Sequence, residues 1–228
     1  MNSSLSRLQD AIRAGEILPF SFSVHPLLMD AFGVCYNHLN KSGFAEEYAM
    51  IMKTERLALK SPHEVGAAEL CDYYWANRDY SKEYEPIRED AFYTEEYQNT
   101  ALDMMRQEWE TQKSYRFFIC LDDQVIGTIA LNNIVMGPFR SCFLGYGLDG
   151  RYTKQGYMTE AVQKIIEFAF QEVKLHRIEG NVMPKNLASR AILKKCNFIC
   201  EGLSKKYLKI NGIWEDHLHY VLLNDALE

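Results

Sequence analysis

The chain has 228 residues, a length that favours one compact domain with an appendage over two full domains. Hydrophobic residues make up 47% and charged residues 25%, and these near-average proportions exclude a largely disordered or collagen-like chain. The formal net charge of −6 has the wrong sign for a protein that binds nucleic acid over its whole surface, so no direct nucleic-acid partner is expected.

Residues 1–50 are predicted to form an N-terminal extension, and the main domain is expected to span residues 51–228. Apolar side chains recur at helical spacing within residues 4–13 and again within 25–39, with Gly15 between the two segments. This pattern predicts a helical extension. Two roles stay open for it: packing on its own domain, or binding a partner or a second copy of the chain.

From Lys53 onward the pattern is that of an α+β domain. The segment TERLALKS alternates apolar and polar residues and predicts an opening strand, whereas apolar residues at helical spacing predict a helix at 158–171. Asn211-Gly212 is a strong two-residue turn signal and predicts a terminal hairpin. The other predicted elements are helices at 64–74, about 98–109 and 185–196, and strands at 115–121, 125–135, 142–149 and 176–184. This order predicts a mixed, mostly antiparallel twisted sheet flanked by helices.

The six cysteines include no CxxC pair, so we expect reduced thiols and no metal site. The beginning of the sequence lacks a basic segment followed by an uninterrupted apolar one, which a secretory signal would have. No stretch of about 18 apolar residues occurs either. A cytoplasmic protein with no membrane partner is therefore expected.

The segment GRYTKQGYM at 150–158 joins the predicted strand 142–149 to the following helix. Gly156 allows a ligand to approach the backbone closely, and the first amides of a helix have no partner within the helix. Lys154 adds a positive charge to the positive end of the helix dipole. The segment is therefore a candidate anion site, and a phosphate is a suitable ligand for it.

This loop and the sequence after it resemble one family. YTKQGYMTEA is similar to the acyl-coenzyme A pyrophosphate loop of the GNAT acetyltransferases, Q/R-x-x-G-x-G/A, with Gly156 as the central glycine. Downstream, N-x-M-P-x-N, N-x-x-S and YL-x-I-x-G-x-W-x-DH resemble the branch that acetylates the N-terminal alanine of ribosomal proteins. The resemblance covers about residues 53–225, and it departs from the loop motif at Thr153, Lys154 and Met158.

The resemblance implies a GNAT fold and direct transfer of acetyl from acetyl-coenzyme A to a primary amine, first of all the N-terminal alanine of a ribosomal protein. The alternatives are a small amine, such as a polyamine or an aminoglycoside, and a non-catalytic acyl-coenzyme A-binding regulator. No metal is implied. The cofactor-binding residues carried over from the family are Phe143, Leu144, Gly145, Tyr146, Lys154, Gln155, Gly156, Tyr157, Met158, Thr159, Asn186 and Ser189.

The two residues expected to be catalytic are Ser189 and Asn181. The resemblance implies that Ser189 donates a proton or a hydrogen bond to the leaving thiolate and that Asn186 contacts the pantetheine; a surface serine and a helix N-cap are the structural alternatives. Some relatives carry a glutamate base where this chain has Asn181, which can orient a water but accepts a proton poorly. The base stays open among Glu85, Glu201, Glu215, Asp216, His217 and His176.

The acceptor amine is expected to bind between the loop at 77–92 and the terminal hairpin. This loop is rich in carboxylates and tyrosines, a composition that attracts a cationic amine and a basic peptide.

Overall fold

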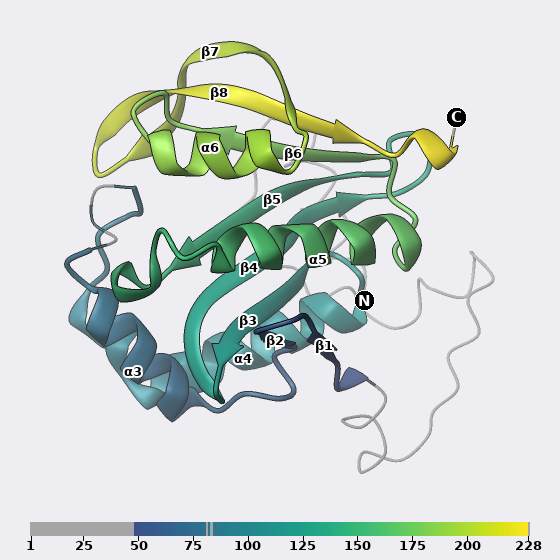
Figure 1. Cartoon of the computed structure of the whole chain (residues 1–228). Helices are drawn as coiled ribbons and strands as arrows, with labels where there is room; N and C mark the ends of the chain where they lie inside the picture. The colour runs from purple at the N-terminus through teal and green to yellow at the C-terminus, as the bar shows by residue number, and fades with distance from the viewer. Residues whose placement is uncertain (1–47, 81, 83, 228) are drawn as a thin grey trace, which may run out of the picture. The chain divides into compact units, whose positions relative to one another are not determined.

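The computed structural model describes residues 48–80, 82 and 84–227, and its centre is an eight-stranded sheet with the order β1-β2-β3-β4-β5-β6-β8-β7 (Figure 1). Neighbouring strands are antiparallel except for β5 and β6, which run parallel. The strands are β1 (Ile51–Lys53), β2 (Ala58–Lys60), β3 (Tyr115–Leu121), β4 (Gln124–Val135), β5 (Ser141–Leu148), β6 (Arg177–Val182), β7 (Ile199–Ile210) and β8 (Ile213–Leu223).

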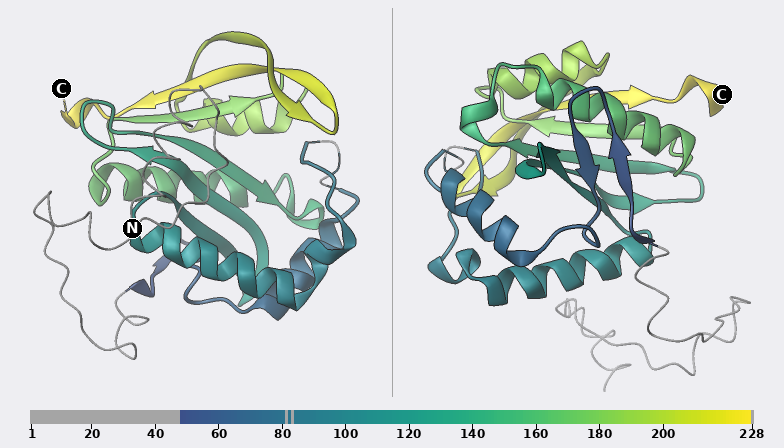
Figure 2. Two further views of the ribbon diagram at one scale, coloured as in Figure 1. Left: turned by 180° about the vertical axis from the view of Figure 1, so that it is seen from behind. Right: turned by 60° about the horizontal axis from the view of Figure 1, so that its bottom comes forward.

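Helices cover both faces of this sheet (Figures 1 and 2). Helices α5 (Tyr157–Gln171) and α6 (Leu187–Lys195) lie on one face, and α3 (Ala67–Asn77) and α4 (Glu95–Glu110) lie on the other. The predicted mixed sheet flanked by helices is confirmed.

Strand β3 is buried on both of its faces. Phe117 and Ile119 belong to the large core cluster under α5, whereas Phe118 and Cys120 belong to a smaller cluster under α3 and α4. A strand covered on both sides needs apolar residues at successive positions, which explains the uninterrupted run FFIC.

The observed elements differ from the predicted ones mainly near the start of the domain. The single strand predicted from TERLALKS is the three-residue β2, and β1 precedes it to form a hairpin. The helix predicted at 64–74 lies at Ala67–Asn77. The helices expected within 4–13 and 25–39 fall outside the described residues.

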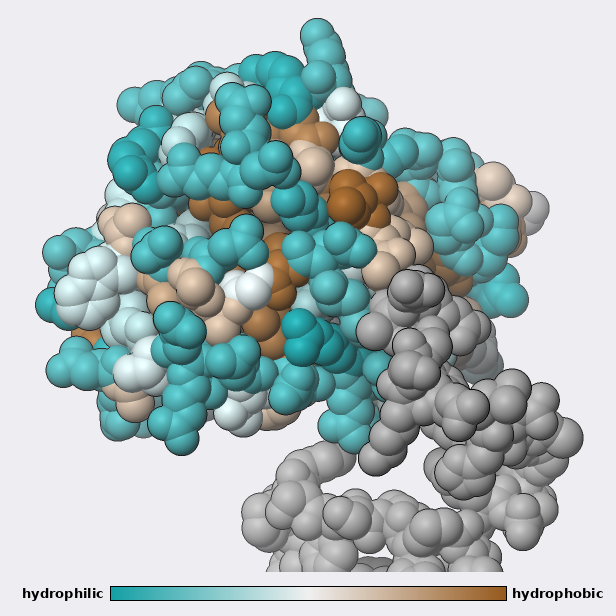
Figure 3. Space-filling model, turned by 90° about the horizontal axis from the view of Figure 1, so that it is seen from below, coloured by the Kyte–Doolittle hydropathy of each residue, from teal (hydrophilic) through white to brown (hydrophobic). Residues whose placement is uncertain are grey.

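The surface view from below is mostly hydrophilic, with hydrophobic residues showing in patches between polar ones (Figure 3). In the described ranges, no helix is both long enough and apolar enough to cross a membrane.

Gly127 of β4 is required by the close approach of β5. A Cβ at this position would lie 2.7 Å from the carbonyl oxygen of Gly147, so an added methyl group has to separate the two strands. We expect Gly127→Ala to lower the free energy of unfolding by about 1–3 kcal/mol, the usual cost of overpacking, as measured by urea denaturation.

The matched control for this experiment is Gly202→Ala in β7. A Cβ at Gly202 meets nothing within 4 Å, so the free energy of unfolding of the Gly202→Ala variant should stay close to that of the wild type. Equal stability of the two variants would contradict the proposed role of Gly127.

Candidate functional site

The site lies where β5 and β6 separate. The two strands pair only over Ser141–Phe143 and Arg177–Glu179, although β5 continues to Leu148. Beyond Phe143, the edge of β5 that faces β6 therefore leaves backbone groups available to a ligand.

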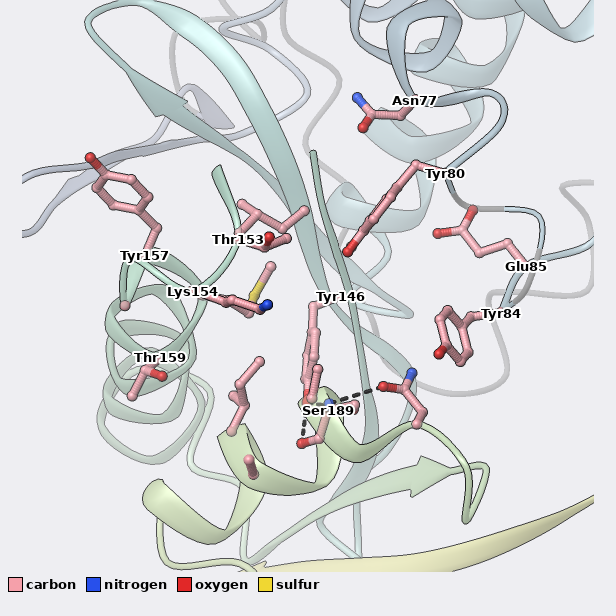
Figure 4. Close-up of a pocket in the computed structure, with 18 of the residues that line it drawn as sticks. Asn77, Tyr80, Tyr84, Glu85, Tyr146, Thr153, Lys154, Tyr157, Thr159 and Ser189 are labelled. Atoms are coloured by element: carbon pink, nitrogen blue, oxygen red, sulfur yellow. Dashed lines mark hydrogen bonds between the residues drawn. The ribbon is translucent and has the colours of Figure 1, made fainter. Parts of the chain in front are cut away.

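A cavity of about 550 Å³, called here the first cavity, opens at this divergence (Figure 4). The end of β5, the loop before α5 and the first turns of α5 and α6 form its walls, with α3 and the loop after it on the other side. Lining residues used below are Glu85, Tyr146, Lys154, Gly156, Met158 and Ser189.

The loop before α5 presents bare amides to the first cavity. Gly156 is the N-cap of α5 with a φ of 87°, a left-handed conformation that suits glycine. The first bond of the helix runs from the Glu160 amide to the Gly156 carbonyl, so the amides of 157–159 have no backbone acceptor within the described part of the chain. The exposed Lys154 side chain lines the same wall. Free amides and a nearby lysine at a helix N-terminus are the features that suit an anion, so the loop stays the candidate anion site.

Arg56, just before β2, supports this loop. Its guanidinium donates to the Gln155 carbonyl at 3.0 Å, forms an ion pair with Glu160 at 2.7 Å, and lies 4.4 Å from the Tyr157 ring centroid. Burial opposes ionisation of Glu160, but hydrogen bonds from Thr54 and Arg56 outweigh it and hold the pKa of that carboxyl below its usual value. Arg56 thus neutralises a carboxylate that would otherwise repel an anion. Sequence reasoning missed Arg56, because no motif marks it.

Tyr146 and Ser189 meet across the first cavity. Their hydroxyl oxygens are 2.8 Å apart, where either hydroxyl can be the donor, and the Ser189 carbonyl, 3.2 Å from the Tyr146 hydroxyl, is a second acceptor for the tyrosine proton. Burial raises the pKa of Tyr146 well above its ordinary value, with the Ser189 hydrogen bond opposing the rise, so the phenol stays protonated. When Tyr146 donates to Ser189, the serine proton is available to a ligand in the cavity.

Helix α6 holds Ser189 in place through its N-cap. The Asn186 side chain accepts from the Ser189 amide at 3.0 Å, which is the capping geometry, and Asn186 also lines the first cavity. The helix lies close to β6 because Gly180 has no side chain: a Cβ there would be 3.0 Å from Leu193.

Glu85 is the one carboxylate that lines the first cavity among the described residues. Burial raises the pKa of Glu85, and the charges of Arg88 and Arg116 oppose this rise. The turn between β7 and β8 fixes its loop, since the Asn211 side chain donates to the Glu85 carbonyl at 3.2 Å and accepts from the Ile87 amide at 2.8 Å. The partly buried carboxylate is therefore held in the cavity wall by a contact from the terminal hairpin.

A second cavity of about 330 Å³ lies on the sheet face covered by α3 and α4. It meets the first cavity at five shared residues, which are Tyr73, Asn77, Glu85, Tyr146 and Gly147. A molecule bound here reaches Glu85 and Tyr146 from the side opposite to the anion site.

Most of the predicted cofactor residues line the first cavity, namely Tyr146, Lys154, Gly156, Tyr157, Met158, Thr159, Asn186 and Ser189. Others lie elsewhere. Gly145 lines the second cavity, Leu144 is buried in the core, and Phe143 forms the last β5–β6 pair. The Gln155 side chain donates to the Arg151 carbonyl.

Asn181 lines neither cavity. Its amide group donates to the Tyr207 hydroxyl at 3.1 Å, and its buried oxygen has no hydrogen-bond partner within the described residues. Other candidates for the base are occupied or distant: Glu201 pairs with Arg177, Glu215 pairs with Lys185, and Asp216, His217 and His176 line neither cavity.

Comparison with known proteins places this site in a family. Residues 56–199 match the family model of the acetyltransferase (GNAT) domain. A probable N-acetyltransferase of Bacillus subtilis strain 168, YjcK, is 43% identical over 150 residues, which are 65% of this chain and 83% of the relative. The ribosomal protein uS5-alanine N-acetyltransferase of Escherichia coli K12 is 34% identical over 170 residues, 73% of this chain and 87% of the relative.

Solved structures agree with this assignment. The ribosomal-protein-S5-alanine acetyltransferase of Vibrio fischeri is 30% identical with a TM-score of 0.73, covering 78% of this chain and 99% of that one. Mycobacterium smegmatis RimJ, solved with CoA-disulfide, is 27% identical with a TM-score of 0.71, covering 78% of this chain and 88% of that one. The chain therefore belongs to the GNAT family and is an N-acetyltransferase.

Proposed function

We propose that this protein transfers acetyl from acetyl-coenzyme A to the α-amine of a protein N-terminus, in the first place the N-terminal alanine of a ribosomal protein. The observation that carries the proposal is the junction of two cavities, with an anion site and the Tyr146–Ser189 pair on one side and Glu85 between them. Relatives that are 34% and 30% identical and are named for alanine acetylation of protein uS5 (S5) support this acceptor.

The chain's own groups suit the co-substrate. The bare amides of 157–159 and the Lys154 side chain are donors for its diphosphate. The free edge of β5 beyond Phe143 offers backbone groups to the amide-containing pantetheine arm, which would place the thioester near Tyr146. RimJ of M. smegmatis, a related structure, was solved with a coenzyme A disulfide.

Proton transfer is then divided between two groups. Glu85 takes the proton of the incoming ammonium group, so that the neutral amine can attack the thioester carbonyl. As the carbon–sulfur bond breaks, the linked hydroxyls of Tyr146 and Ser189 donate a proton to the departing sulfur and regain one from the nitrogen that becomes the amide. This is the role that the family resemblance implied for Ser189. Asn181 lies outside both cavities, so we assign no step to it.

A thiol-release assay with four acceptors tests the proposal. The panel is a basic peptide that begins with alanine, a copy with blocked lysines, a copy with a blocked α-amine, and spermidine. We expect release with the first two and only background release with the N-blocked copy, because the attacking group is the α-amine. Release with spermidine alone would assign the enzyme to small amines and contradict the peptide acceptor.

A further inference from the structure

The second cavity is lined by two arginines that form no direct ion pair among the described residues, although the Glu85 carboxylate interacts electrostatically with both. Arg116 of β3 and Arg88 of the loop after α3 both line it. Among residues 48–80, 82 and 84–227, neither guanidinium has an ion-pair partner or a hydrogen bond, and Arg88 only lies over the Phe92 ring at 4.9 Å. Both charges therefore remain available to a ligand.

Arg116 faces the second cavity because side chains alternate between the two faces of β3. It lies on the same strand face as the buried Phe118, yet it is only partly buried, because its neighbours across the sheet are small. Arg116 pairs in register with Ala130, and Ala130 pairs with Gly145 on the next strand. Ala130 has only a methyl group and Gly145 has no side chain, so they leave space in which a ligand can contact the guanidinium.

Arg116 lines the same cavity as Glu85, Tyr73 and Tyr74, and its charge influences all three groups. Burial raises the pKa of Tyr73, of Tyr74 and of Glu85, and the charge of Arg116 opposes the rise at each of these three groups. A ligand that bridges Glu85 and Arg116 would meet a group that binds a cation and a group that binds an anion.

Two other carboxylates of the loop at 77–92 are paired with basic residues. Asp79 forms an ion pair with Lys82, and Asp90 lies 4.0 Å from Arg78. Glu85 is the one carboxylate lining the second cavity among the described residues. The loop at 77–92 is acidic in composition, which suggested a groove for a basic acceptor. The second cavity itself, however, is lined by one carboxylate and two arginines.

We propose that the acceptor carries a carboxylate next to its reactive amine and that Arg116, assisted by Arg88, binds this carboxylate while the amine lies at Glu85. A planar guanidinium binds a carboxylate through two parallel hydrogen bonds, which fixes its position as well as its charge. The carboxylate belongs either to an acidic side chain beside the N-terminal residue of a peptide or to a free amino acid. The inference rests on the proposed transfer to an α-amine and narrows its acceptor.

The test compares matched acceptors that differ only in the carboxylate. Peptides beginning Ala-Asp and Ala-Glu are compared with Ala-Asn and Ala-Gln, and free alanine is compared with alaninamide. We expect the carboxylate acceptors of one of these sources to have a kcat/KM about 10- to 100-fold higher, the range of a hydrogen bond to a charged group. The pair that shows the preference identifies the source of the carboxylate.

The variant Arg116→Gln should remove this preference and bring the ratio of kcat/KM for charged and amide acceptors near one, in addition to any change in turnover that both acceptor classes share through Glu85. Arg140→Gln, an exposed arginine that lines neither cavity, is the matched control and should keep the preference. If Arg116 served only the structure or the pKa of Glu85, Arg116→Gln would lower turnover of both acceptor classes and keep the wild-type ratio between them, which would overturn the inference.

Calorimetric binding of the same acceptors to the protein loaded with coenzyme A provides a second readout that needs no turnover. Tighter binding of a carboxylate acceptor, lost in Arg116→Gln, supports the inference even where no acetyl is transferred, and that absence of transfer would then count against the proposed function. Equal binding and equal turnover of charged and amide acceptors would overturn the inference and leave the N-acetyltransferase activity untouched.

Discussion

Replacing Ser189 by alanine is expected to lower kcat about 100-fold while the KM for acetyl-coenzyme A changes little, because the hydroxyl acts on the leaving sulfur. The fold of α6 should survive the change, since Asn186 caps the helix through the Ser189 amide and not through its hydroxyl. Steady-state thiol release at saturating acceptor measures the effect.

Tyr146→Phe should cause a similar loss, and the double variant should lose little more than either single one. The two hydroxyls share one hydrogen bond, so removing either group disables the same donor. Ser204→Ala, in β7 and outside both cavities, is the control and should leave kcat unchanged. Losses that multiply in the double variant would show that Tyr146 and Ser189 act independently, and an unchanged kcat in Ser189→Ala would remove that residue from the mechanism.

The parts of the fold that local chemistry determines were predictable from the sequence. The terminal hairpin turns at Asn211 and Gly212, whose φ values of 49° and 87° are those that a type I′ turn requires. Helix α5 follows the apolar spacing of its segment. The β1–β2 hairpin was not predictable, because three-residue strands carry little periodicity and β2 depends on pairing with β3, where Ala58 lies opposite Cys120.

The candidate site also combines residues that local sequence predicts with residues that only long-range contacts bring into place. The loop around Gly156 has a local signal in its glycine and in the helix that follows, so its place was found from the sequence. Arg56 reaches this loop from a distant segment, and Glu85 depends on the Asn211 contact with the terminal hairpin, so neither position follows from local spacing. Arg116 did carry a signal that went unused: a charged residue in the otherwise apolar run YRFFICL.

Glu85→Gln is expected to lower kcat/KM about 100-fold and to change the pH profile of the reaction. In the wild type only Glu85 has to be deprotonated, because it takes the proton of the bound ammonium group, so the logarithm of kcat/KM should rise with a slope of about one and level off above the pKa of Glu85. The glutamine variant cannot take this proton and needs an acceptor amine that is already neutral, so its rise with a slope of about one should continue up to the pKa of the acceptor amine. Glu89→Gln, on the same loop and outside both cavities, should behave like the wild type.

Stability provides an independent check of Glu85, because its pKa is higher in the folded protein than in the unfolded chain. Between these two pKa values the folded state binds more protons, so the free energy of unfolding of the wild type falls as the pH rises through that interval. Glutamine cannot ionise, and the variant should therefore gain stability relative to the wild type as the pH rises from the ordinary glutamate pKa of 4.5 through the raised pKa of Glu85, measured by urea denaturation. A constant difference in the free energy of unfolding across that range would mean that Glu85 is solvated like an ordinary surface carboxylate. In the kinetic experiment, a wild-type kcat/KM in Glu85→Gln would assign the proton transfer to another group.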